Sequence, residues 1–209
     1  MAFAESSVAQ WVGAIATSAA VFLALFKEVI IRFLYPPKLN LMLVKSKGEK
    51  SRVKVQWNGQ ESEDPARYYH LQVSNSRRVS PAQDVQVYLT RVERPGPNQK
   101  LQVEWEGNTP MRWRDQEIHP LQRKIGAPFD CDLCMVTKKC YAEILPVIAP
   151  LYLTKQLSPN TDVVLSFQAR SVEADSDIVR VRICWDGKWE DGDEEMAHHF
   201  IVESLNPTN

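Results

Sequence analysis

The sequence predicts a mainly β protein: an N-terminal transmembrane α-helix followed by an antiparallel β-sandwich. Two observations predict it. An uncharged apolar run at residues 6–26 is long enough to cross a bilayer, and from Lys38 onward the apolar periodicity changes to two, the period of strands. We therefore divide the chain of 209 residues into a transmembrane helix with a juxtamembrane linker at 1–37 and a β-sandwich domain at 38–209.

The overall composition is that of a globular protein. Apolar residues make up 44% and charged residues 24% of the chain, which excludes a disordered or collagen-like protein. The 25 Lys and Arg against 26 Asp and Glu leave a net charge of -1. Because duplex nucleic-acid binders usually carry a basic excess, we expect no duplex nucleic acid as a partner.

The apolar run is expected to form one helix from Ser6 to Leu34, ending before the Pro36–Pro37 pair. Its uncharged part spans about 31 Å at a rise of about 1.5 Å per residue, close to the thickness of a hydrocarbon core. A cleaved signal peptide is the main alternative, but the first ten residues contain Glu5 and no Lys or Arg. A buried helix of a soluble protein would show a polar face, which this segment lacks.

The flanking charges predict the orientation of the helix. Basic residues follow it and none precedes it; they are Lys27, Arg32, Lys38, Lys45 and Lys47. The positive-inside rule then places the N-terminus outside and the C-terminal domain in the cytoplasm, as in a single-pass protein of the inner membrane. Four cysteines in a cytoplasmic domain are expected to stay reduced.

One face of the helix carries only small residues, which on a helical projection are Gly13, Thr17, Ala20 and Ala24. Bulky side chains cluster on the opposite face. Small residues let membrane helices approach closely, so the stripe predicts a homo-oligomer through the helix. The alternative is that small residues are simply common in bilayer helices.

The strands follow in order from Leu39. Short β-rich runs alternate apolar and polar residues and are divided by turns rich in Pro, Gly, Asn and Asp. A polar turn is expected to separate the first two runs. The predicted strands are Leu39–Val44, Val53–Trp57, Arg67–Asn75, Asp84–Val92, Leu101–Trp105, Phe129–Val136, Val163–Ala169 and Val179–Trp185, with His198–Leu205 as a last run to close the sheet.

Two segments depart from the alternation. Glu106–Lys124 is irregular and rich in Arg and Trp, and Tyr141–Thr154 has two prolines in an apolar run, which indicates an edge strand or a buried loop. Eight or nine short strands without a long amphipathic helix are typical of an immunoglobulin-like β-sandwich, with a barrel as the alternative.

Parts of the chain resemble a known group of proteins. The membrane helix, the PP break, the segment RYYHLQVSNSRRVSPAQDVQVYLTRVE and the later IGAPFDCDLCMV are similar to bacterial single-pass membrane proteins with a C-terminal immunoglobulin-like β-sandwich. The resemblance covers roughly a fifth of the chain. It implies a fold and a topology, and it carries no catalytic residues because none are established for the group.

The cysteines are the obvious metal candidates. Cys131 and Cys134 form a CxxC pair, followed by Cys140 and the distant Cys184. Since residues i and i+3 of a regular strand point to opposite faces, the pair is expected to diverge. We interpret these residues as ordinary thiols and expect neither a metal nor another cofactor; a structural zinc site is the alternative.

No catalytic signature is present, so the sequence favours a non-enzymatic protein. The four histidines stand in no metalloprotease or deaminase motif, and no nucleophile elbow, Walker or dinucleotide sequence occurs. The acidic residues of 190–195 lack the order of an EF-hand loop, so they are interpreted as a solvated hairpin loop, with calcium binding as the alternative.

The best remaining binding feature is a basic and aromatic stretch, in which alternating Arg and Trp can stack on and neutralise a nucleotide. The candidate ligand-binding residues are Arg112, Trp113, Arg114, Arg123 and Lys124. Membrane headgroups, or the neighbouring Asp115 and Glu117, are alternative partners of the same arginines.

Two functions remain after these exclusions. The first is a membrane-anchored β-sandwich module that binds an unknown protein or small-molecule ligand at the cytoplasmic face of the membrane. The second is an oligomeric membrane effector of a bacterial antiphage defence system, in which the sandwich senses a signal, such as a nucleotide messenger, and the helices perturb the bilayer.

Overall fold

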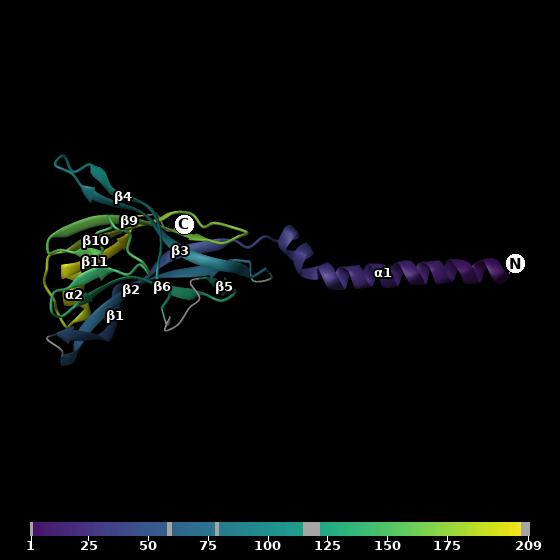
Figure 1. Ribbon diagram of the computed structural model, residues 1–209, viewed down its shortest axis with the longest axis horizontal. Helices are drawn as coiled ribbons and strands as arrows, with labels where there is room; N and C mark the ends of the chain where they lie inside the picture. Colours follow the sequence, from purple (N-terminus) through teal and green to yellow (C-terminus); the bar gives the residue numbers. More distant parts are fainter. Residues whose placement is uncertain (1, 58–59, 78–79, 115–121, 206–209) are drawn as a thin grey trace.

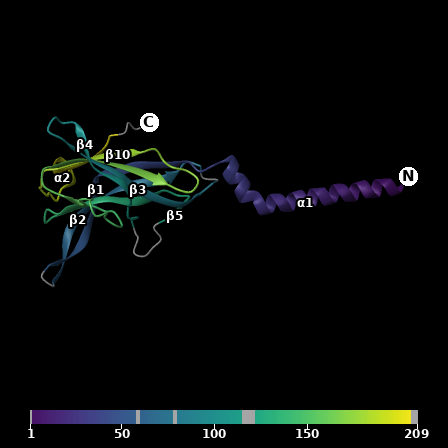
Figure 2. The same cartoon turned by 45° about the horizontal axis from the view of Figure 1, so that its top comes forward.

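A computed structural model of the chain describes residues 2–57, 60–77, 80–114 and 122–205. Helix α1 (Ala2–Leu34) extends away from the β-rich part of the molecule in both views of Figures 1 and 2. It ends directly before Tyr35 and the two prolines, where the sequence predicts its end. The segment Trp11–Leu34 is long and apolar enough to cross a membrane, with a mean hydropathy of 2.0.

Two polar contacts tie the end of α1 to the sandwich. Arg32 Nη1 lies 3.3 Å from Glu173 Oε1, and Arg77 Nη1 donates to the carbonyl of Pro36 at 3.1 Å. The side chains of residues 11–29 are all exposed. The helix surface is therefore left for lipid or for another chain.

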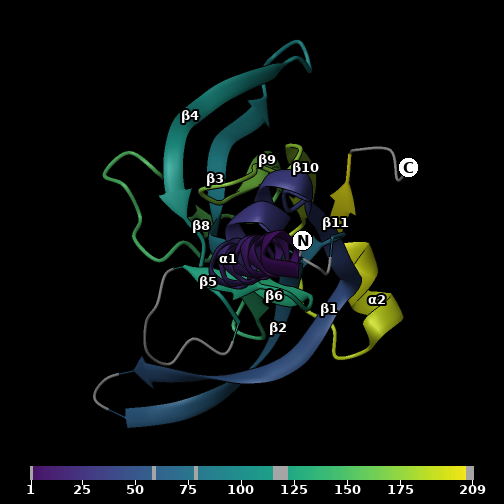
Figure 3. The same ribbon diagram turned by 90° about the vertical axis from the view of Figure 1, so that its right-hand side faces the viewer.

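Sheet one has the strand order β1-β2-β6-β7-β8 and is antiparallel throughout. Its strands are β1 (Leu39–Trp57), β2 (Gln60–Asn75), β6 (Phe129–Thr137), β7 (Ala142–Ile144) and β8 (Gln156–Leu157). The two longest, β1 and β2, form a hairpin that reaches out from the body of the sandwich (Figure 3).

Sheet two has the order β11-β10-β9-β3-β4, and β5 (Arg123–Ile125) pairs with the start of β3. Its other strands are β3 (Ala82–Pro95), β4 (Leu101–Pro110), β9 (Thr161–Arg170), β10 (Val179–Trp185) and β11 (Phe200–Ser204). The β3–β4 hairpin reaches out on the side opposite to the β1–β2 hairpin (Figure 3). Both sheets are antiparallel, as predicted.

The core lies between the two sheets and is filled by the apolar faces that the alternation predicts. Tyr69 and Leu71 of β2 meet residues such as Leu89, Leu165 and Ile183 from sheet two, all fully buried. Protein interiors are closely packed, so truncation of any of these large buried side chains would leave a cavity and lower the free energy of unfolding. The prediction of a helix followed by a β-sandwich is confirmed.

Three details of the predicted strands are corrected. The first two runs are one continuous strand, β1, whose register shifts between Val44 and Glu49, so a bulge replaces the expected turn. The last run, predicted from His198, begins with the final two residues of a short helix, α2 (Asp193–His199), before β11. The segment 141–154 contributes β7, which lies inside the sheet between β6 and β8 and not at its edge.

The irregular stretch from Glu106 is partly regular. β4 continues to Pro110, and single bridges then join Met111 to Pro146 and Trp113 to Cys131. Asp115, Glu117 and His119 lie outside the described residues.

Candidate functional site

The segment 112–114 runs alongside β6 and alternates like a strand. Arg114 N donates to the carbonyl of Asp130 at 3.1 Å, and Asp132 N donates to the carbonyl of Arg112 at 2.7 Å. This pairing turns Trp113 into the core, where it is fully buried, while the two arginines point to the outer face of sheet one. Trp113 therefore presents no face on which a ligand could stack.

The other two candidate residues, Arg123 and Lys124, lie on β5 and make different contacts from those of Arg112 and Arg114. The Arg123 guanidinium lies over the ring of Trp113 at 5.9 Å and over that of Phe129 at 5.1 Å. Lys124 is exposed. The five predicted ligand-binding residues thus do not form one surface: Arg112 and Arg114 lie together on the outer face of sheet one, Trp113 is in the core, and Arg123 and Lys124 lie on β5.

Arg112 and Arg114 stand beside a small polar pocket on the outer face of sheet one, which we call the His70 pocket. Its volume is about 260 Å³, and its lining comes from β1, β2, β6 and the 112–114 segment. The lining residues are Glu49, Ser51, Tyr68, His70, Arg114 and Asp132.

Ion pairs fix the two arginines at the pocket. Arg114 makes a bidentate pair with the Glu49 carboxylate and lies 3.5 Å from Asp130 Oδ2. Arg112 Nε lies 3.1 Å from Asp132 Oδ2. The hydrogen bonds from Arg114 and then from Lys45 lower the pKa of Glu49 to about 2, so this carboxylate stays ionised. The charges at the pocket wall are therefore largely paired within the protein.

His70 is the unsatisfied group of the pocket. Only 2% of the residue is exposed, and its Nδ1 lies 3.1 Å from Asp132 Oδ1 without the alignment of a hydrogen bond. Its Nε2 is buried and has no hydrogen-bond partner in the described part of the chain. Buried polar atoms without a partner are rare because each costs about 1–3 kcal/mol, so a group that pairs with Nε2 would be stabilised there.

Tyr68 forms the aromatic wall of the pocket. Its ring is parallel to the His70 imidazole, with the centroids 6.5 Å apart and the planes 7° apart. Burial raises the pKa of the Tyr68 hydroxyl, which remains a neutral donor and acceptor. Tyr68 therefore contributes an aromatic ring and a hydroxyl to the pocket, beside the buried His70.

Alternation along β2 puts His70 on the face opposite to the buried Tyr69 and Leu71, so this part of the site follows from local pattern. What the sequence misses is the pocket itself. Glu49 follows the bulge of β1, and Asp132 lies opposite His70 across a strand pair 62 residues away in sequence. No local sequence motif predicts that these residues lie close together.

The prediction that Cys131 and Cys134 point to opposite faces is wrong. A bulge in β6 leaves Leu133 without a partner on β2, so Cys131 lies opposite Leu71 and Cys134 opposite Tyr69. Both thiols therefore share the core face, where burial raises their pKa values well above the ordinary range. In the described residues no group of three or more His, Cys, Asp and Glu is placed to hold a metal ion.

The acidic residues of 190–195 are exposed, as predicted, but the segment is not a simple hairpin loop. Part of it is the first turn of α2, and it is attached to sheet one. Fully buried Arg67 donates to Asp193 Oδ1 at 2.7 Å and to the carbonyls of Asp191 and Gly192 at 2.9 Å. The hydrogen bond from Arg67 is the largest cause that lowers the pKa of Asp193. Arg67 thus fixes the segment to sheet one, which is a structural role. His198 and His199 belong to this helix and not to a strand.

The predicted self-association stripe lies on exposed helix. Gly13, Thr17, Ala20 and Ala24 are all exposed, and the Thr17 hydroxyl donates to the Gly13 carbonyl at 2.8 Å. The hydroxyl is thus satisfied within the helix and leaves the stripe free of unpaired polar groups.

Comparison with known proteins adds no assignment: no protein-family model and no curated protein sequence matches this chain.

Proposed function

We propose that the protein is a non-enzymatic, membrane-anchored binding module that holds a small polar ligand in the His70 pocket. α1 anchors the chain, and the basic residues that follow the helix support a cytoplasmic position for the sandwich at the inner membrane. We also infer an immunoglobulin-like type of sandwich, which the sequence resemblance supports. A reporter fused after Asn209 that is active in the periplasm would contradict the orientation.

The observation that carries the proposal is the unpartnered Nε2 of His70. Asp132, beside Nδ1, favours the tautomer with the proton on Nδ1, which leaves Nε2 as an acceptor. The ligand must then donate a hydrogen bond, as a hydroxyl or amino group does. Since Glu49 and Asp132 are neutralised by Arg114 and Arg112, the pocket favours a hydroxyl-bearing molecule over an ion.

A thermal-shift screen of full-length protein in nanodiscs tests this function, with small uncharged polyols as probes. A ligand of the pocket should raise the melting temperature of the wild type and leave His70→Leu unchanged, since binding stabilises the folded state. Arg182→Gln, on the other sheet, serves as the control and should respond like the wild type. Hits that stabilise His70→Leu equally, or no hits from the class, would contradict the proposal.

The second candidate, an oligomeric membrane effector, is favoured by the exposed small-residue stripe of α1. Replacing Gly13 or Ala20 with Ile should weaken oligomers in detergent by about 1–2 kcal/mol per site, because bulk prevents close approach. Phe22→Leu, on the bulky face, is the matched control.

Cross-linking at a fixed detergent concentration measures the change, and toxicity on overexpression should disappear on deletion of residues 1–35. A monomeric wild type, or equal behaviour of Gly13→Ile and Phe22→Leu, would leave α1 as a simple tether.

A further inference from the structure

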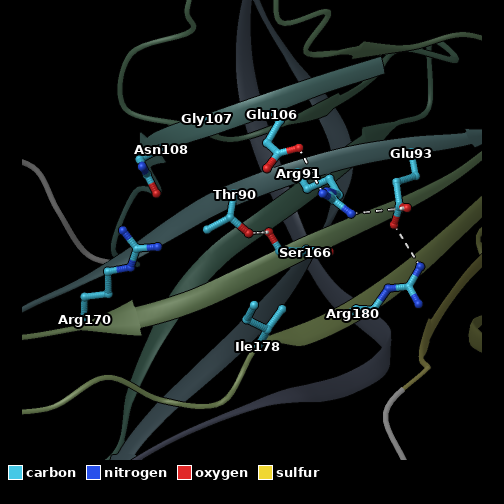
Figure 4. Close-up of a pocket in the computed structure, with 10 residues that line it drawn as sticks. All are labelled: Thr90, Arg91, Glu93, Glu106, Gly107, Asn108, Ser166, Arg170, Ile178 and Arg180. Atoms are coloured by element: carbon cyan, nitrogen blue, oxygen red, sulfur yellow. Dashed lines mark hydrogen bonds and ion pairs between the residues drawn. The ribbon is translucent and has the colours of Figure 1, made fainter. Parts of the chain in front are cut away.

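A second concave surface lies on the outer face of sheet two, formed by β3, β4, β9 and β10 (Figure 4). Two irregularities shape it. Thr90 is an extra residue of β3 relative to β9, and Gly107 and Asn108 of β4 have no partner on β3. Such bulges bend a sheet locally, and the resulting groove has a volume of about 650 Å³.

Three arginines and two glutamates line this groove, which leaves an excess of one positive charge. Arg180 Nη2 lies 2.8 Å from Glu93 Oε2, and Arg91 Nη2 lies 2.9 Å from Glu106 Oε2. Arg91 also approaches Glu93, at 4.0 Å. The two carboxylates are therefore shared by Arg91 and Arg180, and the remaining charge belongs to Arg170.

Arg170 is held in place without a carboxylate. Its Nε donates to Gln168 Oε1 at 2.8 Å, and its guanidinium lies 5.6 Å from the centre of the Tyr88 ring. Within the described residues no carboxylate pairs with it. These two contacts fix the plane of the guanidinium while its Nη atoms stay available, the arrangement in which arginine binds an oxyanion through a fork of two donors.

Arg182 on the same sheet is, by contrast, already paired with a carboxylate. Its Nε and Nη2 bind the two oxygens of Asp162 at 2.9 and 2.8 Å. An anion that approaches Arg182 must compete with this pair, whereas one that approaches Arg170 does not. Substitution of Arg182 is therefore a control for substitution of Arg170 on the same sheet.

Asn108 and Ile178 indicate the kind of anion. Figure 4 shows the side chains of Asn108 and Arg170 pointing toward each other across one end of the groove. With its carboxamide turned so that Nδ2 faces Arg170, Asn108 adds a donor, and a phosphate group has enough oxygens to accept from it and from the arginine fork together. Half-exposed Ile178 lines the same groove, whose volume exceeds that of a phosphate ion and suits a larger organic molecule.

We propose that this groove binds the phosphate group of an organic phosphate, with the Nη atoms of Arg170 as the principal donors. The site is separate from the His70 pocket, because it lies on the other sheet. Glu173, three residues beyond Arg170, contacts Arg32 at the end of α1, so both a soluble nucleotide and a lipid headgroup are sources of the phosphate.

Calorimetric titration of full-length protein in phosphatidylcholine nanodiscs tests the soluble source, with AMP, inorganic phosphate and acetate as probes. AMP should bind more tightly than phosphate, and acetate should bind most weakly. Arg170→Gln should weaken AMP binding at least tenfold, Arg170→Lys should weaken it less, and Arg182→Gln should match the wild type.

Nanodiscs that contain phosphatidate test the lipid source. If AMP does not bind, a rise in melting temperature with phosphatidate that is lost in Arg170→Gln and kept in Arg182→Gln supports the groove as a headgroup site. The proposal is overturned if neither probe acts, or if Arg170→Gln and the wild type respond alike. Neither of these outcomes bears on the proposed function of the His70 pocket, because the screen for that pocket uses uncharged hydroxyl compounds and the variant His70→Leu.

Discussion

The two outer faces of the sandwich carry arginines beside carboxylates, yet they differ in how those charges are held. On sheet one, Asp132 and His70 are buried, and the arginines at the pocket wall are paired. On sheet two, Glu106 has a side chain that is 62% exposed, and Arg170 has no carboxylate partner in the described chain. Burial and pairing, more than the number of arginines, therefore decide whether a charged face favours an uncharged ligand or an anion.

A further difference is the connection of each face to the core. The 112–114 segment carries the two arginines of sheet one on either side of buried Trp113, so that face is attached to the core through one large side chain. The arginines of the groove lie on the continuous strands β3, β9 and β10. We expect substitutions of the buried or paired groups on sheet one to lower stability as well as binding at the His70 pocket, and those in the groove to act mainly on binding.

The largest expected effect is that of Trp113→Ala, which should lower the free energy of unfolding by about 3–5 kcal/mol, because it leaves a cavity beneath the His70 pocket. Chemical denaturation measures it. Trp105→Ala on β4, where the ring is only half-buried, should cost less than half as much. Equal costs would remove the distinction between the two faces.

Asp132→Ala should have an intermediate effect. The substitution leaves His70 buried without its neighbouring carboxylate and removes the partner of Arg112, at an expected cost of about 1–3 kcal/mol. The matched change on sheet two is Glu106→Ala, which removes an exposed pair and should cost about 0–1 kcal/mol. A larger loss for Glu106→Ala than for Asp132→Ala would reverse the comparison.

The smallest expected effect is a pH dependence at Glu49. Its pKa of about 2 in the folded protein lies below the ordinary value of 4.5, so the unfolded chain binds a proton first as the pH falls. The stability that Glu49 provides is therefore complete above about pH 4.5 and is lost between there and pH 2.

The corresponding measurement compares the melting temperature of the wild type with that of Glu49→Gln across this range. The two should differ by the equivalent of about 1 kcal/mol at neutral pH, after solvent screening, and should converge toward pH 2. A difference that stays constant with pH would show that the pair with Arg114 does not stabilise the fold.

Much of the fold could be predicted because it depends on local pattern. The break at Pro36 ends α1, and the alternation in Val179–Trp185 gives the bounds and the buried face of β10 as the structure has them. The candidate site could be predicted only in part. Arg112 and Arg114 were found from their charge and spacing, whereas Glu49 and Asp132 join them through strand pairing that no local signal encodes.

The sequence by itself thus determined a helix long and apolar enough to cross a membrane, the strands and the apolar face of most of them, since periodicity and run length reflect interactions between near neighbours in the chain. Only the tertiary structure decided where those strands bulge and which polar residues meet. The extra residues at Leu133 and Thr90 shift every later partner by one position, which brings two cysteines to one face and opens the groove beside Arg170. The reason is that register depends on hydrogen bonds between distant strands, and these form only when the whole sheet is assembled.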